Sequence, residues 1–406
     1  MSSPWSTSGA GLGAGSGCRS AGRWPGVAAA SRSRGARIRK RRRTGQYRSG
    51  VISLAAKPAL SGLTDDELSK WLAARDQPFY RARQIRQDLW RGVAIEAMSE
   101  LPSELRRQLA EDFRSHSLEE IRRTEADQAS TTKLLYRLED GYTVEAVVMR
   151  YERRSTLCIS SQVGCPIGCP FCATGQGPFG RNLRSHEIVD QGVDAARLLR
   201  EEDRRLSHIV FMGMGEPMAN YEAVLAAVRR LVEPGGLGIS PRRITVSTAG
   251  LVPRIERLAD EGLPVTLAIS LHAARDDLRD DLVPINRKYP LAAVVAAADR
   301  FGQKTGRRVS YEWVVLAGVN DSERDALELG NLLRGRLAHV NLIPFNPVDD
   351  TPYKEPEPPA LRRFAAQIRA QGLNVTLRDT RGREGDAACG QLRARVEREL
   401  LQPKEV

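Results

Sequence analysis

The first 64 residues contain no aspartate and no glutamate. The same stretch carries ten arginines together with Lys40 and Lys57, so its charge of +12 equals that of the whole 406-residue chain. The residues that follow are therefore neutral overall. The basic pI describes the N-terminal stretch, and net charge by itself indicates no basic surface on the rest of the chain.

Long apolar runs are also missing. No uninterrupted run approaches the roughly 18 residues that predict a transmembrane helix, and aromatic residues make up only 5% of the chain. Apolar residues at 41% are enough for a large core, and the length fits two or three domains. The six cysteines are too few and too clustered for a secreted disulfide framework. We therefore expect a reducing, cytoplasmic setting.

Residues 1–58 are rich in Gly, Ser, Ala and Arg and include "RIRKRRR" at 37–43. This composition predicts a disordered basic tail. Three interpretations stay open. The tail is an arm that attracts RNA, a transit peptide that targets an organelle, or an upstream extension from a misplaced start codon.

Residues 59–118 are expected to form a small helical accessory domain. Thr64–Glu67 spells a capping box ahead of an apolar-periodic segment. Residues 80–90 predict a basic amphipathic helix, whose charged face is either simply solvated or contacts RNA. Residues 119–150 are expected to form a β-hairpin linker that turns at Asp140-Gly141.

A strand–helix rhythm follows. Apolar, β-branched strands are predicted at 157–163, 208–213, 243–248, 265–270, 309–316 and 339–345, with amphipathic helices between them. This alternation predicts an α/β fold, a six-stranded partial parallel β/α barrel over 151–350. Residues 351–406 would form a C-terminal extension with a helix at 359–371, a strand at 374–378 and a Gly-rich loop at 379–391. The predicted strands end in polar or Gly-rich segments, "SSQVGC", "GMGEP", "STAG", "SLHAA" and "IPFNP". In parallel barrels the functional site lies at these carboxyl ends.

Three cysteines follow the first barrel strand with the spacing C-x3-C-x2-C, at Cys165, Cys169 and Cys172. Zinc sites more often use two C-x2-C pairs a dozen or more residues apart, although Cys158 could complete an all-thiolate zinc site. A [4Fe–4S] cluster held by three thiolates instead leaves one iron open for a substrate or cofactor. The pattern favours the cluster.

The cysteine motif at this place in a partial barrel resembles that of the radical S-adenosylmethionine (SAM) superfamily. "GMGEP", after the next strand, resembles the glycine-rich SAM motif of that superfamily, in which the backbone and Glu216 would hold the methionyl amino group. Glycines suit this place because they let the backbone approach a ligand closely.

Within the superfamily, residues 145–392 resemble the adenosine-C2 RNA methyltransferases that act on 23S rRNA and tRNA. The matching stretches include "LCISSQVGC", "CPFCATGQGPFGRNL", "FMGMGEPMANY", "ITVSTAGLVP", "LVPINRKYPL", "VNLIPFNP" and "GDAACGQL". The resemblance implies that Cys165, Cys169 and Cys172 ligate the cluster. The SAM contacts that it implies are Gly215, Glu216, Ser247, Ser270, Leu271, His272 and Asn346.

The family mechanism implies roles for three further residues. Cys389 would carry the methyl group, which it takes from one SAM. A second SAM would generate the radical that activates this methyl group for addition to C2, a carbon too poorly nucleophilic for ordinary methyl transfer. Cys158 would then form a disulfide with Cys389 and free the methylated base, and Glu145 resembles the acid/base residue of the family.

The resemblance also implies partners: 23S rRNA and tRNA, and a low-potential electron donor such as flavodoxin or ferredoxin. It implies a monomer with no membrane association. Three alternatives stay open: a C8-adenosine 23S rRNA methyltransferase that confers antibiotic resistance, a glycyl-radical activating enzyme, and a zinc-stabilised RNA-binding protein without catalysis.

Overall fold

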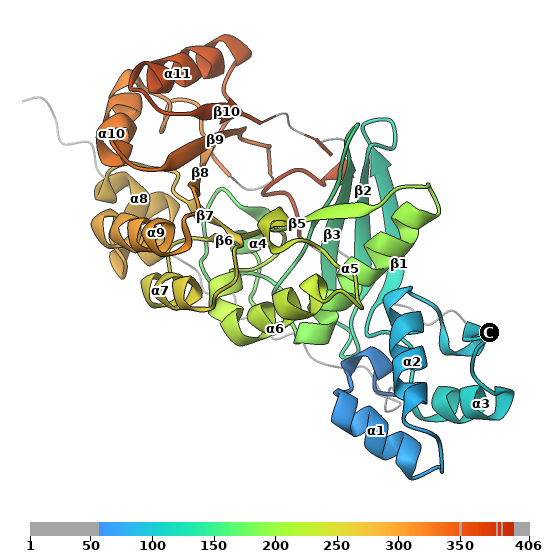
Figure 1. Ribbon diagram of the computed structural model, residues 1–406. Helices are drawn as coiled ribbons and strands as arrows, with labels where there is room; N and C mark the ends of the chain where they lie inside the picture. Colours follow the sequence, from blue (N-terminus) through green and yellow to red (C-terminus); the bar gives the residue numbers. More distant parts are fainter. Residues whose placement is uncertain (1–56, 349–350, 379–380, 383–384, 394–406) are drawn as a thin grey trace, which may run out of the picture. The chain divides into compact units, whose positions relative to one another are not determined.

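A single sheet of ten strands, β1 to β10, runs through the fold in the order of the chain (Figure 1). The computed structural model describes residues 57–348, 351–378, 381–382 and 385–393, which belong to one compact unit. Almost all of the predicted basic tail, together with the chain after residue 393, therefore lies outside the described residues. No helix among the described residues combines the length and the apolar character needed to cross a bilayer.

Six parallel strands form the predicted α/β barrel segment. They are β4 (Ser155–Cys158), β5 (Leu206–Phe211), β6 (Ile244–Thr248), β7 (Thr266–Ser270), β8 (Val309–Val315) and β9 (Ala338–Pro344). All six were predicted from the sequence, which confirms the fold class. The strand count differs in detail, because β10 (Val375–Leu377) adds a seventh parallel strand beside β9.

The first barrel strand is shorter than predicted. β4 ends at Cys158, and the chain turns into the cysteine loop. Beyond Cys158 the regular ladder gives way to individual bonds: the Ile159 amide donates to the Val210 carbonyl at 2.9 Å, and the Ser160 hydroxyl donates to the Glu145 carbonyl at 2.5 Å and accepts from the Met214 amide at 2.8 Å.

Helices cover the outer face of the parallel strands, as Figure 1 shows for α6, α7 and α9. They are α5 (Ser185–Arg200), α6 (Tyr221–Val232), α7 (Val252–Asp260), α8 (Asp276–Leu282), α9 (Leu291–Thr305), α10 (Glu323–Leu333) and α11 (Pro358–Ala370), whereas the short helix α4 (Ala173–Gln176) follows directly on Cys172. The long members bury one apolar face against the strands, as the periodicity predicted. The α9 helix ends where Gly306 takes a positive φ of 66°.

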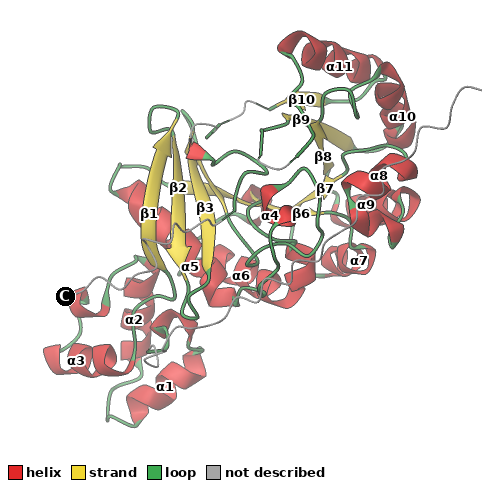
Figure 2. Ribbon diagram, turned by 180° about the vertical axis from the view of Figure 1, so that it is seen from behind, coloured by secondary structure: helices red, strands yellow, loops and turns green. Residues whose placement is uncertain are grey.

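Three antiparallel strands precede the barrel and stand side by side in Figure 2: β1 (Glu119–Ala126), β2 (Thr131–Arg137) and β3 (Thr143–Arg150). The hairpin predicted around Asp140-Gly141 is present as β2 and β3, and β3 pairs antiparallel with β4. The β1 strand was not predicted. Its sequence, "EEIRRTEA", is mostly charged, and most of its residues are exposed or only partly buried. It therefore lacks the apolar alternation that predicts a strand.

The N-terminal helices α1 (Asp65–Ala73), α2 (Tyr80–Trp90) and α3 (Ser103–Asp112) enclose a small apolar core of their own. The predicted capping box at Thr64 and Glu67 is formed. Asp190 on α5 fastens this segment to the barrel, since it accepts hydrogen bonds from Ser61 Oγ at 2.7 Å and from the Ser117 amide at 2.8 Å. Burial alone would raise the pKa of Asp190, but its bonds from His116 and Ser117 hold that pKa at about 2.

Candidate active site

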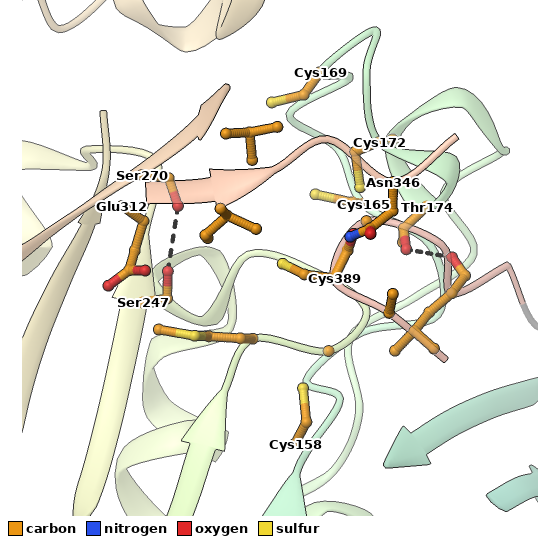
Figure 3. A pocket seen from close by; sticks show the side chains of 18 of the residues that line it. Cys158, Cys165, Cys169, Cys172, Thr174, Ser247, Ser270, Glu312, Asn346 and Cys389 are labelled. Carbon is orange, nitrogen blue, oxygen red and sulfur yellow. Dashed lines mark hydrogen bonds between the residues drawn. The ribbon is translucent and has the colours of Figure 1, made fainter. Parts of the chain in front are cut away.

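One pocket at the carboxyl ends of the parallel strands collects most of the residues that the sequence predicted (Figure 3). The predicted residues that line it are Cys158, Cys165, Cys169, Cys172, Gly215, Glu216, Ser247, Ser270, His272, Asn346 and Cys389. All five of these cysteines are free thiols. Segments more than 200 residues apart in the chain thus meet around one cavity.

The three motif cysteines sit on a tight loop between β4 and α4. Two glycines make the loop possible: Gly164 and Gly168 have φ values of 74° and 73°, and a Cβ on Gly164 would lie 2.3 Å from the Pro178 carbonyl oxygen. Burial raises the pKa of Cys165 to about 12 and that of Cys169 well above its usual value. Without a positive partner these thiols would stay protonated, so a bound metal group is the natural source of the charge that ionises them.

Among the described residues, no group of three or more His, Cys, Asp or Glu side chains is arranged to hold one metal ion. A single zinc ion would need its thiolates gathered within about 2.3 Å of one centre. A cubane cluster makes a different demand, because each of its protein thiolates binds a different iron.

Glu216 is fixed at the wall of the pocket by backbone groups. Its Oε1 accepts from the Met218 amide at 2.9 Å and its Oε2 from the Ala249 amide at 2.7 Å, and the Thr248 side chain also hydrogen-bonds the carboxylate. Burial raises the pKa of Glu216 to about 7, and those backbone bonds oppose the rise. Beside it, Gly215 has a φ of 104°, and a Cβ there would meet the Gln162 Cβ at 2.6 Å.

Two buried acceptors of residues that line the pocket have no donor among the described residues. Glu312 Oε2 and Asn346 Oδ1 are buried and have no hydrogen-bond partner among the described residues. The other oxygen of Glu312 is already used, since it accepts from Ser310 Oγ at 2.7 Å and from Asn341 Nδ2 at 3.0 Å. Buried acceptors left without donors are costly, so they point to a ligand that brings donors, such as the hydroxyls and amino group of a nucleoside.

His272 lies at the end of β7 with a φ of 60°. Its Nδ1 accepts from the Val314 amide at 3.0 Å, and burial together with the nearby Arg279 lowers its pKa to about 3. The ring is therefore neutral with its proton on Nε2, which makes it a donor and not a cation. Ser247 and Ser270, on neighbouring strands, approach each other at 3.3 Å between hydroxyl oxygens (Figure 3).

The segment around Cys389 is docked onto the cysteine loop. The Gly390 carbonyl accepts from the Ala173 amide at 2.7 Å, the Leu392 carbonyl accepts from Thr174 Oγ1 at 2.6 Å, and the Cys389 carbonyl accepts from Asn346 Nδ2 at 3.0 Å. Cys389 is exposed as a residue, yet its side chain points into the pocket in Figure 3. This docking holds its sulfur beside the motif cysteines.

Cys389 is linked electrostatically to the motif cysteines on one side and to Cys158 on the other. Burial raises the pKa of Cys389, and Cys172 adds to the rise. Burial, and after it Cys389, raise the pKa of Cys158 to about 12. The guanidinium of Arg378 opposes both shifts, because it faces both sulfurs. Arg378 follows β10 directly and was not predicted as a site residue.

Two predicted residues do not line this pocket. Leu271 is fully buried, and its backbone pairs with Glu312 and Arg279. Glu145 faces a second, neighbouring cavity, where Lys133 Nζ lies 3.1 Å from its Oε1 and the Arg393 amide donates to its Oε2 at 2.9 Å. The Glu145 carboxylate thus holds the chain four residues beyond Cys389.

Arg378 and Glu312 line the pocket and were missed by the sequence analysis. The sequence gives a weak indication of both, because each is the one charged residue of a predicted strand. Glu312 lies in "VSYEWVVL", and Arg378 ends "NVTLR". A charge in such a place faces either solvent or a site, and only the fold distinguishes the two.

A cysteine loop after the first strand, a glutamate fixed at the end of the second and unpaired acceptors around one pocket define a radical SAM protein. The family model of the radical SAM superfamily matches residues 159–330. The solved structure of a radical SAM methyltransferase from Sphaerobacter thermophilus superposes with a TM-score of 0.80 at 50% identity, covering 83% of this chain and all of that one.

Curated relatives narrow the family. "Probable dual-specificity RNA methyltransferase RlmN" of Frankia alni is 50% identical over 353 residues, which cover 84% of each chain. The relative of the same name from Thermobifida fusca is 48% identical over 82% of this chain and 94% of its own. The chain therefore belongs to the RlmN family of dual-specificity RNA methyltransferases, and it is a radical SAM RNA methyltransferase.

Proposed function

We propose that the chain methylates C2 of an adenosine in both 23S rRNA and tRNA, with Cys389 as the methyl carrier and two SAM molecules consumed per turnover. The observation that supports this most strongly is the meeting of five cysteines in one pocket. Radical SAM chemistry alone needs three of them. Cys158 and Cys389 are not needed to bind the cluster. A methyl carrier and a thiol that resolves its link to the base account for both.

The residues present fit the cofactors of this family. We propose that Cys165, Cys169 and Cys172 hold a [4Fe–4S] cluster, and that SAM lies against Gly215, Glu216, Ser247, Ser270, His272 and Asn346. Leu271 is next to Ser270 and His272 in the chain, but it is fully buried and does not line the pocket. The unpaired oxygens of Glu312 and Asn346 suit the donors of an adenosyl group. When bound, the cluster would supply the electron that cleaves SAM.

Cys389 would act first as a nucleophile. Its thiolate forms an S–CH3 bond while the carbon–sulfonium bond of SAM breaks, which leaves S-adenosylhomocysteine. The thiolate is the reactive form, and burial disfavours it. Arg378 lowers the pKa of Cys389 and so offsets part of that burial.

Cys158 would act last. Its thiolate attacks the sulfur of Cys389 once that sulfur is linked through a methylene group to the base. A disulfide forms, and the two electrons that the thiols give up pass to the methylene carbon, which takes a proton and becomes the methyl product. Both cysteines line the same pocket, and Cys389 helps to raise the pKa of Cys158, which supports this pairing.

Glu145 remains the proposed acid/base residue. Its bond to the Arg393 amide also supports a second task, holding the segment that carries Cys389. We further propose that a flavodoxin or ferredoxin donates the electron and that the chain acts as a monomer.

The proposal is tested on anaerobically purified protein and on RNA from a deletion strain and its complement. Iron content near four per chain and broad visible absorption are expected, whereas stoichiometric zinc without iron would contradict the cluster. Mass spectrometry should find 2-methyladenosine in both RNAs of the complemented strain. If 8-methyladenosine is found instead, the site of methylation is C8.

Binding of SAM should weaken in acid, because the carboxylate of Glu216 must accept hydrogen bonds from the amino group of SAM. The pKa of Glu216 is raised from 4.5 to about 7, so Glu216 is protonated below pH 7 and ionised above it. Affinity is expected to fall about tenfold per pH unit below 7. Equilibrium dialysis of SAM with cluster-reconstituted protein at pH 6 and pH 8 measures this. Glu216→Gln should bind weakly at both pH values. A wild-type affinity that is equal at both would contradict the assignment.

Replacing Arg378 with glutamine should slow methylation of Cys389, because the thiolate loses its nearby positive charge. A rise of one pKa unit lowers the thiolate fraction about tenfold near neutral pH. The S-methyl product on Cys389 is followed by peptide mass spectrometry against time, at several pH values. Arg378→Lys, which keeps the charge, should restore most of the rate. If glutamine and lysine behave alike, the charge of Arg378 is not what matters.

A further inference from the structure

Arginine pairs stand immediately before most of the parallel strands. They occupy 153–154 before β4, 204–205 before β5, 242–243 before β6 and 307–308 before β8. The amino ends of parallel strands meet at one edge of a sheet, so the four pairs share the end of the barrel opposite the catalytic pocket. The net neutrality of this part of the chain therefore conceals a local concentration of positive charge.

The last strand of the barrel repeats the pattern, with Arg334 and Arg336 shortly before β9. Of the six strands β4 to β9, only β7 has no arginine shortly before it. Arg307 bridges that gap, since its guanidinium donates to Thr266 Oγ1 on β7 at 2.8 Å and to the Arg242 carbonyl at 3.4 Å. We call the ten arginines before these five strands the arginine floor. Six strands about 4.8 Å apart span on the order of 24 Å.

The arginine floor is poorly neutralised. Among the described residues, Arg336 is its one member with an ion pair, to Asp299. Five acidic residues share the segments before these strands, but Glu201 pairs with Arg197 and Glu202 pairs with Arg150, both outside the floor. Eight of the ten arginines are exposed.

The positive charge of the arginine floor lowers the pKa values of neighbouring groups. Burial, and after it Arg154 and Arg243, lower the pKa of His208. Burial, and after it Arg242, lower the pKa of Arg307. Mutual repulsion of this kind means that the arginines lie close together, which costs stability unless something else is gained.

The negative carboxyl ends of the helices explain only part of the arrangement of arginines. Five helices, α5, α6, α7, α9 and α10, end at this edge, and each helix end carries about half a negative charge. Together they amount to two or three negative charges, against ten arginines. The five acidic residues of these segments reduce the net charge further, so what remains for an external partner is the set of exposed floor arginines that have no ion pair.

A hollow beside the floor points the same way. A cavity of about 510 Å³ is lined by Arg204 and Arg205 of the floor and also by Arg91 and Arg200. No acidic residue lines it. Burial, then Arg91 and Arg197, lower the pKa of Arg200, and Glu201 opposes the fall only in part. The basic surface thus reaches from the barrel to the N-terminal helix α2.

We propose that the arginine floor binds the phosphate backbone of structured RNA at a distance from the catalytic pocket. Guanidinium groups bind phosphates well, and regularly spaced phosphates supply the repeated negative charge that such a strip lacks. Since β5 alone, with six residues, separates the floor from the pocket by about 20 Å, one short hairpin cannot occupy both. The floor would therefore favour large folded RNAs over isolated stem–loops.

The test compares two double variants of equal charge change. Arg243→Gln with Arg308→Gln removes two exposed floor arginines, and Arg362→Gln with Arg363→Gln removes two exposed arginines of α11 as the control. Affinity for an unmodified full-length tRNA transcript and for its isolated anticodon hairpin is measured over a range of salt concentrations. For the tRNA, the slope of log K against log salt should shrink by about 1 to 2 in the floor variant and stay unchanged in the control. For the hairpin, all three proteins should give equal slopes.

Equal slopes for the tRNA in all three proteins would overturn the proposal. So would a drop in melting temperature of the floor variant without a change in slope, which would assign the arginines to the helix ends alone. If the tRNA affinity is unchanged and an acidic protein binds the arginine floor instead, the partner is a protein and not RNA. That result would also overturn the proposal. The readout is binding, so it holds whether the methylated carbon is C2 or C8.

Discussion

Cys158→Ala protein is expected to accumulate joined covalently to its RNA. The variant keeps Cys389, Glu216 and the three motif cysteines, so it can still methylate its carrier and attach that carrier to the base. It lacks the thiol that breaks the link. A denaturing gel with labelled RNA should show a slow band that protease removes, while turnover falls by several orders of magnitude.

The double variant Cys158→Ala, Cys389→Ala is the control for this trap. It should give no slow band, because the carrier sulfur is gone. Normal turnover by Cys158→Ala protein would falsify the carrier mechanism for this chain. A slow band that persists in the double variant would show that the link is made by a residue other than Cys389.

Arg279→Met is expected to destabilise the fold strongly. Arg279 has no exposed surface, and its guanidinium donates to the Ala249, Ser270 and Leu271 carbonyls at 2.7, 3.0 and 2.9 Å. It also donates to Asn286 Oδ1 at 2.7 Å. Methionine fills the space but leaves these acceptors without donors, at a cost of about 3–5 kcal/mol. Urea unfolding of the cluster-free protein measures the loss.

Arg287→Met is the matched control, since Arg287 lies nearby and its side chain is 65% exposed. It should change stability by less than about 0.5 kcal/mol. A loss below about 1 kcal/mol for Arg279→Met would mean that water or a rearranged side chain satisfies the carbonyls. In that case Arg279 would not be what holds the ends of β6 and β7 together.

Much of this architecture could be predicted because it rests on local patterns. The six barrel strands are apolar runs between amphipathic helices, and the cysteine loop and "GMGEP" are short contiguous motifs. Residues in such motifs are positioned by the few neighbours that the motif itself contains. The family resemblance rests on contiguous stretches of this kind, and that resemblance supplied most of the eleven predicted residues that line the pocket.

Other features depend on contacts between distant segments, which no local pattern encodes. Arg279 lies within "DDLRDDL", a stretch that looks like an exposed helix, yet it is completely buried. Arg378 becomes a site residue only because β10 pairs with β9. Glu145 lines the cavity next to the catalytic pocket and accepts a hydrogen bond from the Arg393 amide, a contact between segments 248 residues apart.

The parallel pairing of β10 with β9 also has a consequence for the order of folding. A parallel strand can pair only after a long crossover connection has formed, here through α11. The pairing of β10 with β9 is therefore one of the later contacts to form during folding. Until it forms, β9 is an edge strand with unpaired backbone groups, which is a template for aggregation. Chains cut before α11 should therefore be prone to misassembly during synthesis as well as inactive. The same short strand completes the pocket and protects the nascent barrel.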